Sequence, residues 1–459
     1  MADKLAVKAS GSAFIENLKI FSNDESAQTQ EIDLVSKGAP VRLTYYESLL
    51  QDTIVATLVY IDTGNTVDDK TAVEGLPITG SESATLKFTD NNNETLELDM
   101  VVNKVTDIVD DSTKSMVQLD FVSCEFLDND KIRLFTRVDG KVSDHVREIL
   151  TSEEYLNTKK DVDIEETWGE HNKIFSNKKP FYMMNRLSTY SVPEGGEGKT
   201  AGYFLWETSE GFKFKSIDYL FDKEKNPKKK SIIYTETPDS GGKNIPEGYD
   251  VKALSFERDN RVNVKEKFEQ GAFNTRIIMF NPFDCYYEVL TPNAEEIEEK
   301  GGYKTAGAKL PKINPKFNKT KANRNFSRTT FKYLDTGTLP SGKGIGKDQQ
   351  GGGGQVGKST TENFDVKNVL NQGIMRMNQL NIMKLTVTIP GDFSLHAGDS
   401  IFIDAPELKK DTKNDDVDKE NGGLYIIRDL CHYITPKETY TKIILVRDSF
   451  GREGTARSG

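Results

Sequence analysis

One stretch of this sequence has the residue types and spacing of a phosphate-binding loop. Gly352, Gly357, Lys358 and Ser359 satisfy the pattern G-x-x-x-x-G-K-[ST] letter for letter. In such a loop, backbone N–H groups and the lysine hold the phosphates of a nucleotide. The chemistry requires a buried strand that leads into the loop and a helix that leaves it, so that the N–H groups converge on one phosphate.

The residues before this stretch do not predict such a strand. Residues 342–350 are glycine, lysine, glutamine and aspartate, with Ile345 as their one apolar member. Ile401–Asp404 imitates the strand whose aspartate holds the metal in P-loop proteins, but it lies in a β-rich part of the chain. We interpret the match as a chance feature of a Gly/Lys-rich linker. The alternative is a P-loop nucleotide hydrolase, in which Lys358→Ala would abolish nucleotide binding.

The four histidines do not form a catalytic or metal-binding pattern. His145, His171, His396 and His432 are scattered, and no two are four residues apart. Zinc sites and catalytic triads need convergent ligands or a nucleophile with its base. His432 follows a cysteine, but neighbours on a strand point to opposite faces. We therefore expect His432 to pack or hydrogen-bond beside its strand, and we predict no catalytic residue, no metal site and no cofactor.

Length and composition predict a chain of several domains with packed cores. The 459 residues, 36% of them apolar and 9% aromatic, suffice for two to four domains. The formal net charge of −11 argues against a protein that grips nucleic-acid phosphates, because that needs a basic face. The acidic excess either gives solubility or lines a lumen past which DNA slides without sticking. The Lys-rich stretch 223–230 includes Glu224 and no aromatic residue, which favours a solvated loop over a nucleic-acid patch.

Targeting signals and disulfide patterns are not evident. The sequence has no apolar run of 18 residues, and no signal peptide follows Met1. Cys124, Cys285 and Cys431 are far apart, with no Cys-x-x-Cys pair. We expect them to be buried free thiols of a soluble protein that is assembled where it is made.

Residues 1–127 have the pattern of an antiparallel β-domain. Leu96, Leu98 and Met100 alternate with acidic residues, and Asn/Asp-rich turns separate the apolar runs, as in a meander with one buried face. The candidate strands are residues 13–20, 31–35, 41–45, 53–61 and 84–88, with further alternation at 96–100 and 117–121.

The middle of the chain mixes helices and strands. A short helix is predicted within residues 141–150, with Ser143 as its N-cap. A second is predicted over residues 177–189, with Pro180 near its first turn. A hairpin with a Gly-containing turn follows between Tyr203 and Asp218.

The stretch from Asn381 to Asp448 consists of strand patterns bounded by Gly, Pro and Asp. A helical pattern over residues 362–380 precedes it. Strands are also indicated at 251–256, 275–280 and 286–290, and we expect them to belong to the same unit as the C-terminal strands. Residues 292–360, which are rich in Lys, Asn, Gly and Pro, predict a long loop.

The order of these motifs resembles the central baseplate hub of contractile-tailed phages, and it is similar to phage tail protein D and to the hub part of the type VI secretion spike. The hairpin with Trp206 and the following Gly-Phe-x-Phe-x-Ser-Ile-Asp resembles the second domain of such hubs. The motifs near the C-terminus are Gly391-Asp392-Phe393-x-Leu395-x-x-Gly398-Asp399, the strand end Asp404-x-Pro406, Tyr425-x-Ile427 with a following His432, and Val446-Arg447-Asp448-Ser449.

The resemblance implies a structural protein and not an enzyme. In that family, a homotrimer with two tube-like β-domains per subunit forms a pseudo-hexameric ring that joins the six-fold tail tube to the three-fold cell-puncturing spike. We therefore expect an α+β, mainly β fold. It comprises a first tube-like antiparallel β-barrel domain (1–127), a mixed α/β domain with long inserts (128–249 and 293–380), a second tube-like β-barrel domain (250–292 and 381–450) and a flexible tail (451–459).

The resemblance also implies partners and a location. The partners would be two further copies of the chain, the tail tube protein, the spike protein and other baseplate proteins, with genome DNA passing through the lumen without specific binding. The location would be the virion tail baseplate, assembled in the host cytoplasm, and a spike or wall-degrading enzyme would be a separate protein. The hub of a secretion system or tailocin remains open as an alternative.

Subunits of such a ring would join through strands whose edges are unpaired in one chain. The candidate strands are Thr53–Ile61, Leu96–Val102, Ile382–Ile389 and Thr439–Val446. The inserts at 221–249 and 292–360 depart from the family pattern, so the resemblance implies no contacts for them.

Overall fold

The computed structural model of the chain describes most of its residues. They are residues 13–25, 29–37, 39–67, 69–110, 113–195, 201–235, 245–260, 263–273, 275–281, 285–291, 305–307, 314, 326–333, 366–405 and 417–452.

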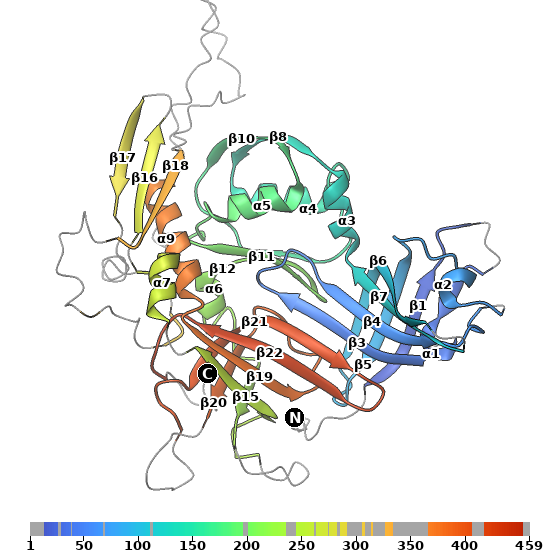
Figure 1. Cartoon of the computed structure of the whole chain (residues 1–459). Coiled ribbons are helices and arrows are strands. Elements are labelled where there is room, and N and C mark those ends of the chain that lie inside the picture. The colour runs from blue at the N-terminus through green and yellow to red at the C-terminus, as the bar shows by residue number, and fades with distance from the viewer. Residues whose placement is uncertain are drawn as a thin grey trace, which may run out of the picture.

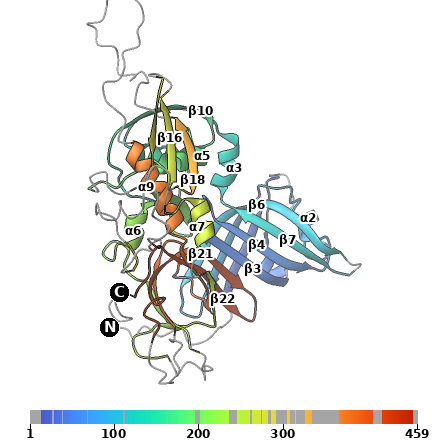
Figure 2. The same ribbon diagram turned by 60° about the vertical axis from the view of Figure 1, so that its left-hand side comes forward.

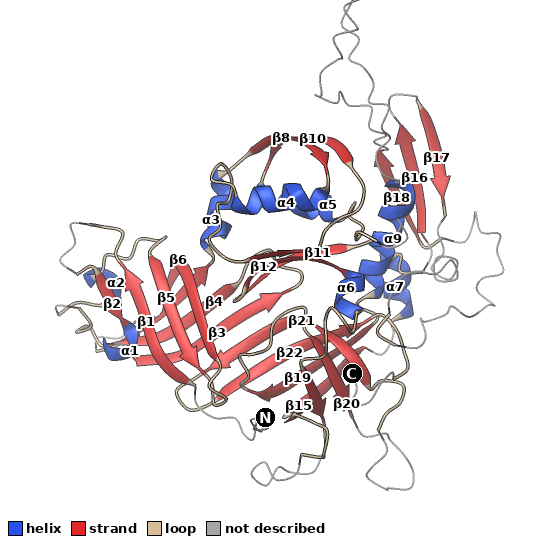
Figure 3. Ribbon diagram, turned by 180° about the vertical axis from the view of Figure 1, so that it is seen from behind, coloured by secondary structure: helices blue, strands red, loops and turns tan. Residues whose placement is uncertain are grey.

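The fold is mainly β, with 46% strand and 17% helix, which confirms the expected class at that level (Figures 1 and 3). No helix in the described part of the chain has the length and apolar character needed to span a membrane. The helices are α1 (Leu34–Lys37), α2 (Ala72–Gly75), α3 (Cys124–Lys131), α4 (Val142–Thr151), α5 (Pro180–Ser188), α6 (Ile217–Phe221), α7 (Val264–Gln270) and α9 (Val366–Gln379).

One sheet of 14 strands extends through both ends of the chain. Its first half contains the strands that alternation predicted, in the order β3-β4-β7-β6-β5-β1-β2. This order differs from the expected meander, because β4 pairs with β7 and β1 pairs with β5. These strands are β1 (Phe14–Phe21), β2 (Glu31–Asp33), β3 (Ala39–Ser48), β4 (Val55–Asp62), β5 (Ser83–Thr89), β6 (Thr95–Asp110) and β7 (Ser115–Val122).

The second half of the sheet contains the predicted C-terminal strands. They are β19 (Met383–Pro390), β20 (Ser400–Asp404), β21 (Gly423–Ile434) and β22 (Thr439–Arg447), joined by β13 (Lys230–Ile233), β14 (Val251–Lys252) and β15 (Ser255–Asn260). Because β13 pairs in parallel with β14 and β20, this half is mixed. The ladders close no barrel among the described residues. Ala253 and Leu254, between β14 and β15, donate their amides to the carbonyls of Ile233 and Thr388, so they link β13 with β19.

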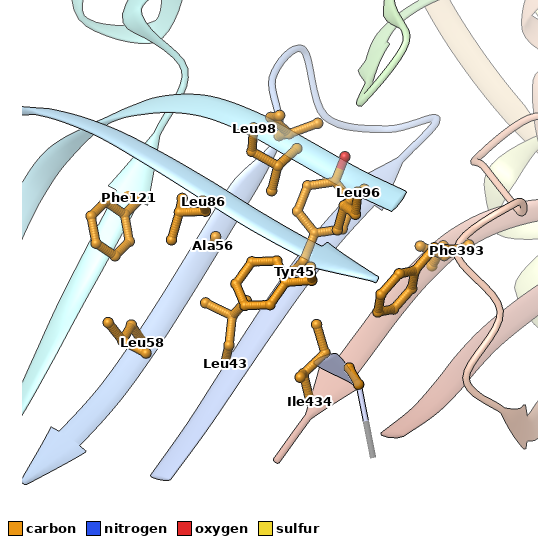
Figure 4. Close-up of a cluster of buried hydrophobic side chains, with 14 of the residues drawn as sticks. Leu43, Tyr45, Ala56, Leu58, Leu86, Leu96, Leu98, Phe121, Phe393 and Ile434 are labelled. Atoms are coloured by element: carbon orange, nitrogen blue, oxygen red, sulfur yellow. The ribbon is translucent and has the colours of Figure 1, made fainter. Parts of the chain in front are cut away.

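The two halves meet edge to edge. β21 pairs antiparallel with β3, from Asp429 opposite Ser48 to Ile434 opposite Leu43. Apolar side chains from both halves also share one core, in which Tyr45 of β3 lies near Phe393 and Ile434 (Figure 4). The alternation that buries one side of each strand therefore continues across the joint.

The middle of the chain lies above the sheet in Figure 1. Its strands are β8 (Leu134–Gly140), β9 (Val162–Ile164), β10 (His171–Lys178), β11 (Tyr203–Thr208) and β12 (Gly211–Ser216). The hairpin predicted between Tyr203 and Asp218 is confirmed by the β11–β12 ladder. Helix α5 is also confirmed, and it begins at Pro180.

The predicted N-cap of α4 is wrong. The helix begins at Val142, so Ser143 lies inside its first turn. The Ser143 amide donates to Oγ1 of Thr167 at 3.0 Å, and the Ser143 hydroxyl donates to Glu166 at 2.9 Å. A hydroxyl from a distant segment thus satisfies an amide that a local cap would have satisfied.

A separate three-stranded sheet projects from the molecule beside α7 and α9 (Figure 1). It consists of β16 (Thr275–Asn281), β17 (Tyr286–Leu290) and β18 (Arg328–Tyr333). The strands expected at 275–280 and 286–290 are β16 and β17, and they pair with each other. The second partner of β16 is β18, which lies within the predicted loop 292–360. The boundaries of the domains themselves remain a prediction.

Three of the four strands predicted to have free edges are interior strands. β4 lies between β3 and β7, β19 between β15 and β22, and β22 between β19 and β21. The fourth, β6, pairs with β5 over Thr95–Val101 and with β7 over Val101–Asp110, so Leu96–Met100 has a partner strand on one side only. Alternation identified these strands because it is strongest where a strand packs fully. For the same reason, strong alternation favours interior strands over edges.

Candidate functional site

The P-loop-like stretch lies outside the described residues. Gly352, Gly357, Lys358 and Ser359 all fall between residues 334 and 365, which the structure does not describe. Its interpretation as a chance match therefore stays a prediction, and so does the absence of a cofactor.

The histidines lie in separate environments, as their spacing indicated. His145 on α4 faces Glu148 at 3.5 Å, and His171 on β10 lies edge-on to Tyr190. His396 and His432 are both near the joint of the two halves, but each has its own partners. No group of three His, Cys, Asp or Glu residues in the described ranges is arranged to hold a metal ion.

His432 packs beside its strand as expected. Its ring stacks on Tyr45, with centroids 5.9 Å apart, and contacts Phe393 edge-on. Its Nδ1 lies 2.9 Å from Oγ1 of Thr441. Because the ring is fully buried, its pKa falls from 6.5 to about 4. His432 is therefore a neutral core residue at pH 7.

This burial predicts a pH dependence. His432 titrates at 6.5 when exposed and at about 4 in the folded chain, so the unfolded state binds the proton first as the pH falls. The contribution of neutral His432 to the free energy of unfolding is fully present above pH 6.5. It is lost as the pH falls toward 4, by about 3 kcal/mol in total. We expect urea unfolding to show that wild type loses more stability between pH 7 and pH 4 than His432→Phe. Equal losses would contradict the assignment, since the other titrating groups are common to both proteins.

The cysteines are free, but the expectation that they are buried is wrong. Cys124 and Cys285 are exposed, and Cys431 is half-buried. Cys124 begins α3. Cys285 lies in the turn between β16 and β17, with a positive φ of 52°. Both occupy element ends, where the side chain has few neighbours to cover it.

The most elaborate polar cluster lies where the two halves of the sheet and the middle of the chain meet. We call it the junction, and it centres on Glu47 of β3, which is fully buried. The carboxylate accepts from the Tyr45 hydroxyl at 2.7 Å, the Ser209 amide at 3.0 Å and the Ala397 amide at 2.8 Å. It also lies 3.2 Å from Nδ1 of His396. One side chain thus holds the first half of the sheet, the β11–β12 turn and the loop before β20.

Charge pairing explains why a carboxylate is stable at this buried position. Burial raises the pKa of Glu47, but the neighbouring His396 and the donated hydrogen bonds outweigh it, so the pKa of Glu47 is lowered. Burial likewise lowers the pKa of His396, but the carboxylates of Glu47, Asp399 and Glu210 outweigh it, and the pKa of His396 is raised. Each side chain therefore favours the charged form of the other, and the two form a buried ion pair.

A second buried carboxylate stabilises the neighbouring contact. Glu207 on β11 accepts from the Ile54 amide at 3.0 Å, the Ser123 hydroxyl at 2.6 Å and Nζ of Lys160 at 2.6 Å. Lys160 also pairs with Glu125 of α3 at 2.8 Å. The middle of the chain is therefore attached to the first half of the sheet by hydrogen-bonded charges as well as by apolar contacts.

Sequence reasoning missed this junction. Glu47 and Glu207 were not singled out, because an acid in a strand pattern indicates the solvent face. A signal was nevertheless present: Glu47 lies two residues from Tyr45, so alternation places it on the buried face of β3. An acid on the apolar face of a predicted strand needs a partner, which predicts a buried polar cluster.

The arrangement joins distant segments of the chain. The junction places its acids against amides, hydroxyls and one histidine, and its members satisfy one another. What it can do chemically is hold three parts of the chain in one orientation.

The comparisons with known proteins concern the fold of the chain. No family model matches the sequence, and no curated protein matches it. Among solved structures, a tail protein from Neisseria meningitidis MC58 matches with a TM-score of 0.51 and 9% identity, over 95% of this chain and 97% of that one. The 43 kDa tail protein of prophage MuSo2 from Shewanella oneidensis matches with a TM-score of 0.50 and 9% identity, over 94% and 98%.

A more distant match is the E. coli c3393 protein, a component of the type VI secretion system, with a TM-score of 0.43 and 8% identity over 96% of this chain and 79% of that one. The first two matches show that the chain has the fold of phage tail proteins along nearly its whole length. The family resemblance drawn from the motifs is thereby confirmed at the level of fold.

Proposed function

We propose that this chain, which has the fold of phage tail proteins, is a central hub subunit of a tail baseplate. It would assemble as a homotrimer that joins the six-fold tail tube to the three-fold spike. The observation that carries the proposal is the edge-to-edge ladder between β3 and β21, which joins two β-rich halves within one chain. A trimer of such chains contains six halves, which matches a six-fold tube on one side and a three-fold spike on the other.

The two halves would act as the two tube-like β-domains. The first consists of β1 to β7. The second is the C-terminal half, in which Ala253 and Leu254 link β13 to β19. Three of the six joints in a ring would be β3–β21 ladders inside the chains, and three would lie between chains.

The joints between chains need strands with an open side, and several of the described strands offer one. β1 is paired on both sides only near its end, because β2 covers only Lys19 to Phe21. β15 pairs with β19 alone, and Leu96–Met100 of β6 pairs with β5 alone. The end strands β2 and β14 are open too, but they have only three and two residues. β1 and β15 therefore join β6 as the candidates whose open edges would be satisfied by pairing in the ring.

The remaining expectations form part of the same proposal. The partners would be the tail tube, the spike and other baseplate proteins, with genome DNA passing through the lumen without specific binding. The protein would act in the virion tail baseplate after assembly in the host cytoplasm, without enzymatic activity or a cofactor. A secretion-system or tailocin apparatus would use the same subunit geometry.

The native mass of the purified chain tests the proposal. We expect light scattering across a concentration series to give a trimer near three times 51.5 kDa, with the same mass with and without ATP. A mass that changes with ATP would contradict the hub and favour the nucleotide hydrolase. A chain that stays monomeric at every concentration, and also fails to co-sediment with tail tube and spike proteins, would contradict the trimer.

A further inference from the structure

The small sheet of β16, β17 and β18 has a face made of apolar side chains. We call it the aromatic face. Phe280 lies opposite Tyr287 of β17 and Tyr333 of β18, and Ile278 lies opposite Val289 and Phe331 in the same register. The rings of Phe280 and Phe331 stack at 6.4 Å, and that of Tyr333 meets both edge-on. Six apolar side chains therefore form one continuous surface.

This face is open, whereas the other face of the same sheet is covered. Tyr287, Phe331 and Tyr333 are 70%, 56% and 71% exposed, whereas Ile277 and Met279 on the opposite face are 2% and 1% exposed. Contiguous exposed apolar surface, and aromatic surface above all, marks protein–protein contacts. The sheet stands away from the rest of the fold in Figures 1 and 3, so a partner can reach the face.

The charge around the face indicates the chemistry of its partner. Arg276 is in register with Ile278 and Phe280 on the aromatic face, whereas Arg328, Lys332 and Glu288 lie on the opposite face with Met279. The chain as a whole has a net charge of −11. The complementary surface is therefore apolar and acidic, and a second copy of this acidic chain can supply it.

One element of the chain has that character. Near the tip of the β6–β7 hairpin, Ile108 and Val109 are 45% and 55% exposed. Asp107 precedes them, and Asp110 and Asp111 follow in the sequence. The β6–β7 hairpin and the small sheet lie on opposite sides of the molecule in both Figure 1 and Figure 2. A contact between two different surfaces on opposite sides is head-to-tail, and a head-to-tail contact can close a ring.

We propose that the aromatic face receives the β6–β7 hairpin tip of a second copy of the chain, so that this contact fastens neighbouring subunits of the ring. The inference rests on the proposed function, because it assumes a trimer. A nucleic acid fits the face less well. Arg276 is the cation that shares the face with the six apolar side chains, whereas single strands bind along grooves that combine stacking rings with rows of cations.

A pair of reciprocal variants tests the contact. The sheet variant carries Phe331→Glu and Tyr333→Glu, and the tip variant carries Ile108→Lys and Val109→Lys. All four side chains are exposed, so circular dichroism and the unfolding midpoint should match wild type. Leu50→Glu, at another exposed apolar position, is the control and should stay trimeric. We expect each double variant alone to be monomeric in light scattering.

The mixture of the two variants gives the decisive result. Each retains the surface that the other has lost, so a 1:1 mixture should form a heterodimer near twice 51.5 kDa and no trimer. If wild type is a trimer and the sheet variant has the same native mass, this inference is wrong, and the proposed hub function is unaffected. A sheet variant that stays trimeric but loses binding to a 30-nucleotide single-stranded DNA would show a nucleic-acid surface instead. A wild-type chain that never trimerises would overturn both proposals.

Discussion

Replacing Glu47 with alanine is expected to lower the free energy of unfolding by about 3–5 kcal/mol, the usual cost of removing one partner from a buried, hydrogen-bonded charge pair. The substitution removes the common acceptor of the Tyr45 hydroxyl and the Ser209 and Ala397 amides. It also leaves His396 buried without its nearest carboxylate. Urea unfolding, followed by tryptophan fluorescence and circular dichroism, measures the change.

The pH dependence of this loss tests its cause. The pKa of Glu47 is lowered from 4.5, so its stabilising contribution is present above pH 4.5 and is lost as the pH falls through the folded value. The pKa of His396 is raised from 6.5, so its contribution is present below pH 6.5 and is lost as the pH rises through the folded value. The difference between wild type and Glu47→Ala should therefore be largest between pH 4.5 and 6.5.

Two further variants separate the charge of Glu47 from its shape and from the general cost of removing a strand acid. Glu47→Gln keeps the shape and one acceptor oxygen but not the charge, so we expect its stability to lie between those of wild type and Glu47→Ala. Glu97→Ala removes an exposed strand acid whose nearest cation, Lys87, is 3.8 Å away, and it should cost less than about 1 kcal/mol. If Glu47→Ala proves as mild as Glu97→Ala, or shows no dependence on pH, the junction does not hold the segments together.

Local pattern predicted the strands, because alternation is a property of neighbouring residues. The β5–β6 ladder and the β11–β12 hairpin formed where Leu96, Leu98 and the Gly211 turn indicated. The edges could not be predicted in this way. Which strands lie at an edge depends on pairings such as Ser48 with Asp429, whose side chains hydrogen-bond across 381 positions of sequence. No local pattern encodes a partner at that distance.

The small sheet contains a strand that local sequence did not predict. β18 lies in a Lys- and Asn-rich stretch, and of its six residues Arg328–Tyr333 only Phe331 and Tyr333 are apolar. Six residues of this composition predict a loop, and they form a strand because β16 supplies a parallel partner. Phe331, Lys332 and Tyr333 alternate in polarity, but two apolar residues in a Lys- and Asn-rich stretch do not suffice to predict a strand, and composition favoured a loop.

A large effect of core packing is expected at Trp206. This side chain is fully buried against Leu49, Leu220 and Ile426, and its Nε1 donates to the carbonyl of Ala397 at 2.9 Å. Trp206→Ala should therefore lower the free energy of unfolding by about 3–5 kcal/mol, through lost burial and the cavity that remains. Trp168→Ala, at the chain's other tryptophan, which is exposed, is the matched control and should have little effect.

Gly398 shows whether the loss at Trp206 comes from packing. Its φ is +92°, and a Cβ at this position would lie 2.7 Å from Cζ2 of Trp206, so Gly398→Ala is unfavourable for two separable reasons. In wild type the new methyl group meets the indole and also strains the backbone. In Trp206→Ala the indole is absent and only the backbone strain remains, about 1–2 kcal/mol. We therefore expect the double variant to be more stable than the sum of the two single losses predicts, as contacting residues show. Strict additivity would mean that Trp206 and the Gly398 turn do not pack against each other.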